Sequence, residues 1–293
     1  MKKKINGYQV FTFFNYIFMF FILFITAYPI YYVLVASFSD PGALSRNTEL
    51  LWAPLRPFTL SAYEMVFDNR LIVSGFVNTL IILIVGLFFN LVLTALGGFF
   101  LALQGPMLKN VITILIIFTM YFSGGLIPSF LNVKDLGLMN TRWALILPGA
   151  LSTYNMIIMK TAFQSIPGSL IESARLDGAS FFQVLVKVMV PLSKATFAVL
   201  VLYYGVAHWN AWFSTSIYLR DSALYPLQLV MRNILNALNT NAQMEGIGAD
   251  EMAQAAELMK YALIVVGTAP VLALYPFVQK YFVKGVMIGA IKG

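Results

Sequence analysis

The chain has 293 residues, of which 60% are hydrophobic and only 11% are charged, and its formal net charge is +7. Soluble domains carry about 25% charged residues, so this composition indicates an integral membrane protein. Cysteine is absent, which excludes a disulfide framework, a thiol nucleophile and a cysteine-based metal site.

Six apolar stretches are long enough to cross a membrane. They are residues 10–36, 71–103, 111–130, 143–163, 196–217 and 259–282. Each has at least the ~20 residues that the hydrocarbon layer requires, and each is expected to be a helix because unpaired backbone is intolerable in lipid. Ser123-Gly-Gly125 and Pro128 are expected to end or bend the third. The sequence therefore predicts an all-α integral membrane protein with six transmembrane helices in one domain, residues 1–293.

The distribution of charge predicts the orientation of these spans. With the N-terminus inside, the cytoplasmic segments hold 11 of the 19 basic residues and only two of the 12 acidic ones, Glu172 and Asp177. This is the asymmetry of the positive-inside rule. Both termini and the polar insert between the fourth and fifth spans are therefore expected in the cytoplasm. The first apolar run is too long for a signal peptide and lacks a small-residue cleavage site, so we expect a retained helix.

Two external segments are long enough to form a surface of their own. Residues 37–70 contain three prolines, which favour an irregular surface. Within residues 218–258, a short amphipathic helix is predicted after Pro226, with apolar residues at helical spacing. These residues are Leu227, Leu229, Val230, Ile234 and Leu238. The segment is interpreted either as a contact surface for a partner protein or as an interfacial helix that rests on lipid.

The polar insert at residues 166–191 is the most informative segment of the chain. Its pattern predicts two short helices, each opened by a capping box, the first stopped by a glycine and the second closed by a proline. These residues are Ser169, Glu172, Gly178, Ser180, Gln183 and Pro191. A compact, capped polar hairpin in a membrane protein indicates that another protein docks there.

The spans contain almost no candidates for chemistry. His208, the single histidine, lies toward the outer end of the fifth span and is interpreted as a hydrogen-bonded residue rather than a metal ligand. No carboxylate is expected near the midplane, where ion-coupled carriers place theirs, and no phosphate-binding GxxxxGK[ST] loop occurs. We therefore expect a transport subunit, not an enzyme, that binds no metal or cofactor and receives its energy from a partner.

The insert resembles the EAA signature of binding-protein-dependent ABC importer permeases. It has Glu172-Ser-Ala174, then Gly178 six residues after the glutamate, then Val188-x-Val190-Pro191. It departs from the signature by serine as the first small residue and by valine for the usual isoleucine and leucine. Asn78-Thr79 and the Gly97-Gly98 turn are similar to the permease core of the same family.

Other segments resemble one branch of that family. Residues 203–213 and 218–221 are similar to the carbohydrate-uptake branch, the maltose-type permeases. Residues 226–229 and the tail at 284–293 most resemble permeases for complex oligosaccharides, such as products of pectin or alginate breakdown. The resemblance covers essentially the whole chain.

The resemblance implies a type I importer fold and oligosaccharide import across the bacterial cytoplasmic membrane. It also implies a heterodimer with a second related permease, two cytoplasmic ATPases that hold ATP and Mg, and an extracytoplasmic solute-binding protein. A permease for peptides or other solutes stays open as an alternative because the hairpin does not specify cargo. An ATPase-independent carrier is a further alternative.

Two groups of candidate site residues follow. The expected ATPase dock combines small residues, which permit close approach, with carboxylates that can pair with basic residues. It consists of Glu172, Ser173, Ala174, Asp177 and Gly178. The expected substrate path combines aromatic rings, which stack on sugars, with amides that bond hydroxyls. It consists of Tyr154, Asn155, Tyr203, Tyr204, Trp209, Asn210 and Trp212. An interfacial aromatic belt and simple helix packing are the alternatives for this second group.

Overall fold

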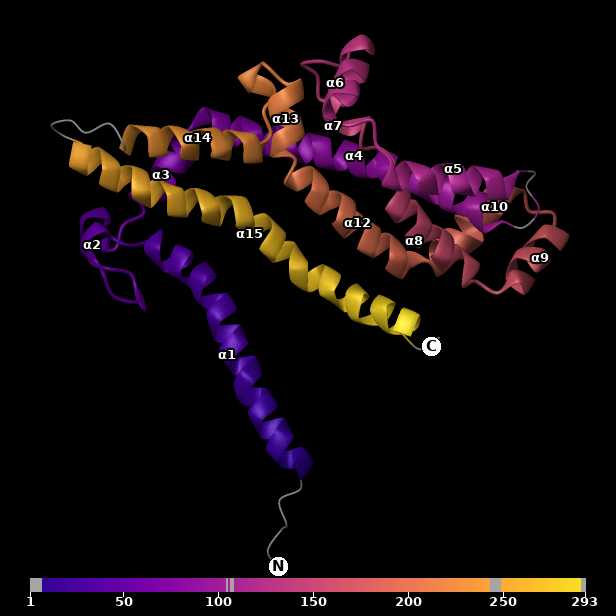
Figure 1. Ribbon diagram of the computed structural model, residues 1–293, viewed down its shortest axis with the longest axis horizontal. Coiled ribbons are helices and arrows are strands. Elements are labelled where there is room, and N and C mark those ends of the chain that lie inside the picture. Colours follow the sequence, from indigo (N-terminus) through magenta and orange to yellow (C-terminus); the bar gives the residue numbers. More distant parts are fainter. Residues whose placement is uncertain (1–6, 104, 106–107, 243–248, 291–293) are drawn as a thin grey trace, which may run out of the picture. The chain divides into compact units, whose positions relative to one another are not determined.

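A computed structural model describes the chain apart from residues 1–6, 104, 106–107, 243–248 and 291–293. The described residues form helices and no strand (Figure 1), so the all-α expectation is confirmed. Two compact units are present, and each is described by itself below. The first is Met1–Asn69 with Asn233–Ala269, and the second is Arg70–Arg232 with Pro270–Gly293.

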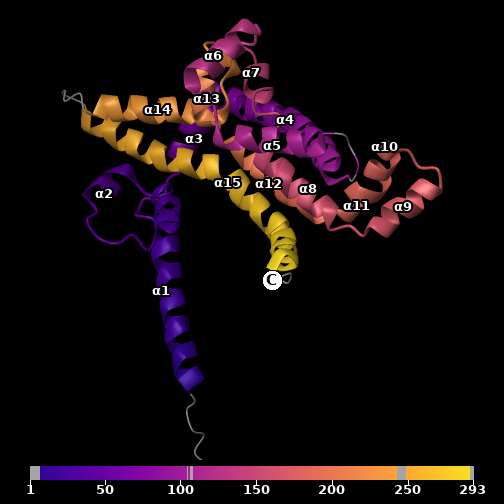
Figure 2. The same ribbon diagram turned by 45° about the vertical axis from the view of Figure 1, so that its right-hand side comes forward.

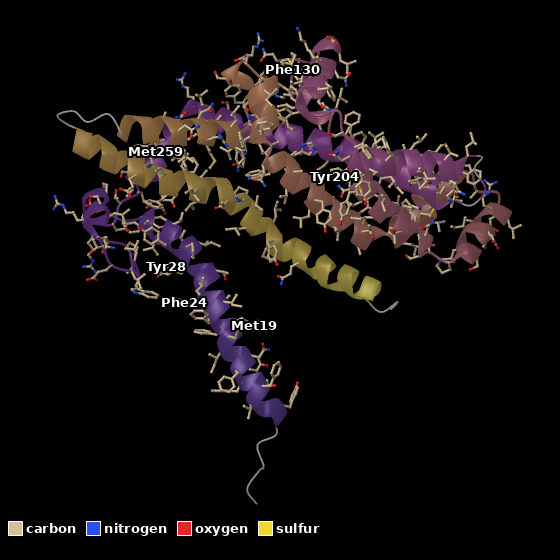
Figure 3. All side chains as sticks on the ribbon, viewed as in Figure 1. Met19, Phe24, Tyr28, Phe130, Tyr204 and Met259 are labelled. Atoms are coloured by element: carbon tan, nitrogen blue, oxygen red, sulfur yellow. The ribbon has the colours of Figure 1, made fainter. Side chains whose placement is uncertain are left out.

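The first unit is built around one long apolar helix. Its helices are α1 (Gly7–Ala36), α2 (Pro41–Arg46), α3 (Ser61–Asp68), the part of α14 (Leu227–Ala242) from Asn233 on and the first half of α15 (Ala249–Ala290). Met19, Phe24 and Tyr28 project from α1 (Figure 3), and the apolar side chains on all sides of its first turns are exposed within the chain. A helix that is apolar all round belongs in a membrane or a protein interior.

The segment after α1 is less irregular than the sequence predicted. Residues 37–70 contain the helices α2 and α3. α2 forms because Pro41 occupies its first turn, where no amide donor is needed, and because Asp40 caps it by accepting a hydrogen bond from Ala43 N at 2.9 Å. The following chain returns to α1, where Tyr28 Oη accepts a hydrogen bond from Leu51 N at 3.0 Å.

The second unit holds the remaining helices. They are α4 (Arg70–Ala102), α5 (Lys109–Tyr121), α6 (Leu126–Asp135), α7 (Trp143–Ile146), α8 (Thr153–Gln164), α9 (Gly168–Leu176), α10 (Phe181–Val184), the π-helix η1 (Leu185–Met189), α11 (Val190–Leu192), α12 (Lys194–Trp209), α13 (Trp212–Tyr218), the 3-10 turn η2 (Ser222–Leu224), the start of α14 (Leu227–Ala242) and the second half of α15. α8 and α12 pack side by side against α4 (Figures 1 and 2). α4 is the central helix of this unit.

Two hydrophobic clusters lie along α4. One joins Phe99 of α4 to Phe163 at the end of α8, Leu200 of α12 and residues of α10 and η1. The other joins Ile82 of α4 to α6, α7 and Tyr218 of α13. The two clusters divide the unit into an end that carries the hairpin and an end that carries α6, α7 and α13.

Two of the predicted spans are not continuous helices. In the stretch 143–163, α7 ends at Ile146 and α8 begins only at Thr153, because Pro148 lacks the amide hydrogen that a helix needs. In the stretch 196–217, α12 ends at Trp209 and α13 begins at Trp212. The expectation of one helix per apolar run is therefore wrong for these two.

The third predicted span bends, as the sequence indicated. α5 and α6 meet at 112°, and Gly125 between them has a φ of +87°, which a residue with a side chain rarely adopts. Among the described residues, three helices are long and apolar enough to cross a membrane, or five if each of two bent pairs counts as one span. The count of six spans stays a prediction.

The hairpin has the two helical arms that the sequence predicted, with one capping box instead of two. Ser180 N donates to Gln183 Oε1 at 2.7 Å and Gln183 N to Ser180 Oγ at 3.3 Å, which confirms the second box. The first box is wrong, since α9 begins directly after Pro167 and Ser169 already lies inside the helix. Gly178 stops α9 with a φ of +83°, as predicted.

The second arm of the hairpin extends further than predicted. The helix was expected to close at Pro191, but α11 continues to Leu192. The wider π turn of η1 interrupts the regular ladder before the proline. Pro191 follows this π turn closely, within a helical path that runs from Phe181 to Leu192.

Candidate functional site

One face of α9 packs against the chain's own core. Ile171 and Ala174 are partly buried against the cluster that contains Phe163 and Leu200. Ala174 was expected to permit close approach of a partner, but it faces inward because it lies three residues after Ile171, on the same side of the helix.

The opposite face of the hairpin is exposed. Glu172, Ser173, Asp177 and Gly178 lie on it. Leu176 is 89% exposed, and the sequence interpretation missed it. The signal was present, since Leu176 lies one helical turn after Glu172 and so on the same face. This face therefore combines two carboxylates with an exposed apolar side chain.

The turn between the hairpin arms is fixed by local contacts. Arg175 places its guanidinium 4.0 Å from the centre of the Phe181 ring and donates a hydrogen bond to Ala179 O at 3.4 Å. Gly178 N donates to Arg175 O and Ala179 N to Ala174 O, which completes a Schellman motif. The exposed face is thus presented by a closed, well-defined loop.

A cleft of about 620 Å³ lies behind the hairpin. Its walls come from the end of α4, the start of α5, the end of α8 and the inner side of the hairpin. The walls are mostly apolar, and Lys109 and Glu172 bring one charge of each sign to it. Glu172 therefore lies at the edge between this cleft and the exposed face of α9.

The substrate-path candidates separate into different environments. Tyr154, Asn155 and Tyr203 line one shallow, open groove of about 530 Å³ between α8 and α12, together with Leu202 and Val206. Tyr154 is 57% exposed, so its ring is free to stack on a ligand. These three residues are the ones that the structure brings together.

Tyr204 and Trp209 lie inside the helix packing instead. Tyr204 is buried on α12 (Figure 3), and its Oη lies 2.7 Å from Thr94 Oγ1 on α4. Trp209 is buried with its ring 6.1 Å from that of Phe76. Neither side chain lines the groove.

Asn210 and Trp212 mark the break between α12 and α13. Asn210 is exposed at the end of α12, and its backbone amide donates to Val206 O at 3.1 Å. The Trp212 ring is covered by the Arg232 guanidinium, 3.4 Å from the ring centre, which is a cation–π contact. These two residues also lie outside the groove.

A buried polar contact that the sequence interpretation missed joins α4 to α12. Asn90 is fully buried and its Nδ2 donates to Gly149 O at 2.7 Å, so its Oδ1 faces His208 Nε2 at 2.8 Å and accepts from it. His208 is therefore hydrogen-bonded, as expected. The signal was the spacing of four residues between Gly86, Asn90 and Thr94 in an apolar run, which places all three on one helix face.

Asn78 and Thr79 anchor the segment after α13 to α4. Asn78 Nδ2 donates to Ala223 O at 2.7 Å, and its Oδ1 accepts from Arg142 Nη2 at 2.8 Å. Thr79 Oγ1 accepts a hydrogen bond from Leu227 N at 2.9 Å, at the start of α14. α14 is the predicted amphipathic helix, and Leu227, Leu229 and Val230 are buried in the protein, so this first part does not rest on lipid.

Comparison with known proteins assigns the family. Residues 94–288 match the family described as the binding-protein-dependent transport system inner membrane component. Two relatives are from Bacillus subtilis (strain 168). Protein LplC is 38% identical over 274 residues, with 92% of this chain and 90% of the relative covered. The polygalacturonan/rhamnogalacturonan transport system permease protein YtcP is 36% identical over 268 residues, with 90% and 92% covered.

A solved structure has a chain with a similar fold. The crystal structure of a bacterial ABC transporter involved in the import of the acidic polysaccharide alginate contains a chain that is 30% identical, with a TM-score of 0.86. The alignment covers 96% of this chain and 100% of that one. The resemblance that the hairpin indicated is thereby confirmed. The chain belongs to the family of binding-protein-dependent transport system inner membrane components, and it is a multi-pass transport subunit with the type I ABC permease fold.

Proposed function

We propose that this chain is the permease subunit of a binding-protein-dependent ABC importer that moves oligosaccharides across the bacterial cytoplasmic membrane. The names of the similar proteins, which concern pectin-type polymers and alginate, support a sugar-chain cargo. The observation that carries the proposal is the hairpin, with a fixed turn, an inner face packed on α8 and α12, and an outer face that presents Glu172, Ser173 and Leu176.

The importer would contain four kinds of subunit. A second, related permease completes the membrane path as a heterodimer. Two ATPases on the cytoplasmic side bind ATP and Mg and dock on the hairpin, and an extracytoplasmic solute-binding protein delivers the sugar. The termini and the hairpin would lie in the cytoplasm, as the charge distribution predicts.

Alternating access would follow from the way the hairpin is attached. The inner face of α9, the end of α8 and the middle of α12 share one hydrophobic cluster, so the cluster cannot separate without exposing buried apolar surface. Closure of the ATPases would therefore move the hairpin together with α8 and α12. This is a rigid-body movement of packed helices rather than local melting.

The groove between α8 and α12 is the candidate for the sugar path. Tyr154 and Tyr203 offer ring faces for stacking, and Asn155, which is 6% exposed, borders the groove beside them. No charged side chain lines the groove in the described residues. The carboxylates of an acidic sugar would be met outside it, by Arg142 or Arg220 at the outer end or by the other permease.

The docking role is tested by Glu172→Ala in the importer reconstituted with its partners. We expect loss of ATPase co-purification and of uptake, because the variant removes a carboxylate that pairs with basic groups of the ATPase. Asp135→Ala is the matched control, since it removes another exposed carboxylate, on α6. If Glu172→Ala retains both properties, the docking assignment fails.

The cargo class is tested with the same vesicles. We expect uptake of oligosaccharides that stops when the ATPases are stripped away. Uptake of peptides but not of oligosaccharides would overturn the cargo class. Accumulation that continues without ATPases would support a carrier.

A further inference from the structure

The segment between α7 and α8, residues 147–152 (the break segment), lies between two packed regions. α7 belongs to the cluster that contains Ile82 and Tyr218, whereas α8 belongs to the cluster that contains Phe99 and Leu200. Pro148 and Gly149 interrupt the helix between them. A proline-containing interruption is where a helical path bends most easily.

One end of the break segment is bound through Asn90. Its Nδ2 donates to Gly149 O at 2.7 Å, and its Oδ1 accepts from His208 Nε2 at 2.8 Å. Asn90 is fully buried and His208 is 9% exposed, so little water competes for these bonds. The carbonyl oxygen of Gly149, which the interrupted helix leaves unpaired, is thus bound to Asn90 of α4 and linked through it to His208 of α12.

The other end of the break segment is bound through Tyr204. Ser152 N donates to Tyr204 Oη at 3.0 Å, and the same Oη lies 2.7 Å from Thr94 Oγ1. Ser152 is also the N-cap of α8, because its Oγ accepts a hydrogen bond from Asn155 N at 3.4 Å. The first turn of α8 is therefore attached to α4 and α12 as well.

The four side chains form two matched pairs. Asn90 and Thr94 are one turn apart on α4, and Tyr204 and His208 are one turn apart on α12. Both pairs face the break segment. Two backbone groups of this segment, Gly149 O and Ser152 N, which lipid could not satisfy, are thus bound by side chains from its two packing partners.

We propose that Asn90 and Tyr204 are positioning residues that keep the break segment from bending during transport. Movement of the hairpin, which enters α8 at its C-terminal end, then passes through the break segment to α7 and its cluster instead of being absorbed between α7 and α8. This inference rests on the proposed function of the chain as a permease driven through its hairpin.

The test measures the angle across the break and the coupling of transport in the same complex. Spin labels at Leu147→Cys and Thr161→Cys, both exposed, report the distance between the start of the break segment and α8. The chain has no native cysteine, and the partner subunits are made cysteine-free. The unsubstituted importer is expected to give one narrow distance distribution without nucleotide and in the vanadate-trapped state.

Tyr204→Phe and Asn90→Ala are each expected to broaden that distribution. Each is also expected to lower the sugar transported per ATP hydrolysed by about fivefold, which corresponds to a loss of about 1 kcal/mol in coupling. Tyr204→Phe keeps the buried ring, so it remains informative if Asn90→Ala fails to assemble. Tyr218→Phe, at another buried tyrosine, is the matched control and should leave both readouts unchanged.

If both variants keep a narrow distance distribution and an unchanged ratio of sugar transported to ATP hydrolysed, the proposal is overturned. It is also overturned if the distribution broadens while that ratio stays the same, because the effect is then purely structural. The distance is read without any sugar present. If the unsubstituted importer fails to transport oligosaccharides while the distances still respond to Tyr204→Phe, the cargo assignment fails and the positioning role does not.

Discussion

Gly86 and Gly97 lie on the same helix, α4, yet a methyl group would meet different neighbours at each. At Gly86 the added carbon would lie 2.5 Å from His208 Nε2, a ring nitrogen held by Asn90. At Gly97 it would approach only Met156, chiefly its Sδ at 2.3 Å. A methionine side chain is flexible and can move aside, whereas the bound imidazole cannot without losing its hydrogen bond.

We therefore expect Gly86→Ala to destabilise the protein by about 1–3 kcal/mol through overpacking and loss of the His208–Asn90 bond. Gly97→Ala is the matched control and should cost much less. Thermal unfolding of the purified chain in detergent measures both. Equal stability of the two variants would contradict the role given to His208.

The start of α14 is an element whose position depends on a side chain from another helix. Leu227 N has no partner in its own helix at this end, and Thr79 Oγ1 accepts its hydrogen bond at 2.9 Å. The same hydroxyl donates to Gly75 O at 2.9 Å. A methyl group at Gly75 would lie 3.2 Å from the backbone of Leu227, so glycine permits this close approach.

Thr79→Val keeps the shape of the side chain and removes its hydroxyl. We expect a loss of about 1 kcal/mol, as for other helix caps, and faster amide hydrogen exchange in the first turn of α14. Thr26→Val is the control, because its hydroxyl donates within its own helix to Ile22 O. Unchanged exchange in α14 would show that apolar burial alone positions this helix.

At the scale of the whole molecule, the two surfaces assigned to partners belong to different segments of the chain. The hairpin presents Leu176, which is 89% exposed, and α14 presents a polar side at Arg232 and Asn233. In the proposed importer these surfaces meet different proteins, since the hairpin is expected in the cytoplasm and α14 outside it.

A photo-crosslinking residue at position 176 is therefore expected to capture the ATPase, and one at position 233 the solute-binding protein. Mass spectrometry of the adducts in the nucleotide-loaded complex identifies the partner at each position. A residue at position 200, which is buried in the core, is the negative control. Adducts only with lipid at position 233, or the same partner at both positions, would contradict the assignment of the two surfaces.

The sequence by itself determined the class of the protein, its family and the local structure of the hairpin. Composition is enough to determine the class, because only lipid or a protein interior tolerates so much apolar surface. The second box, Ser180 with Gln183, and the stop at Gly178 were predictable because capping and left-handed backbone depend on neighbouring residues only. The same local rules predicted the bend near Gly125 and the amphipathic helix α14.

Only the tertiary structure decided which candidate residues share a site. Tyr203 and Tyr204 are adjacent in the sequence, yet one lines the groove and the other is buried against Thr94. The surroundings of these two side chains depend on where α4 and α8 pack against α12, and the local sequence does not contain that information. The same reason explains the inward face of Ala174 and the way in which the break at Pro148 is held. Gly149 can leave the helix because Asn90, 59 residues earlier, binds its carbonyl oxygen, and that contact exists only once the helices have packed.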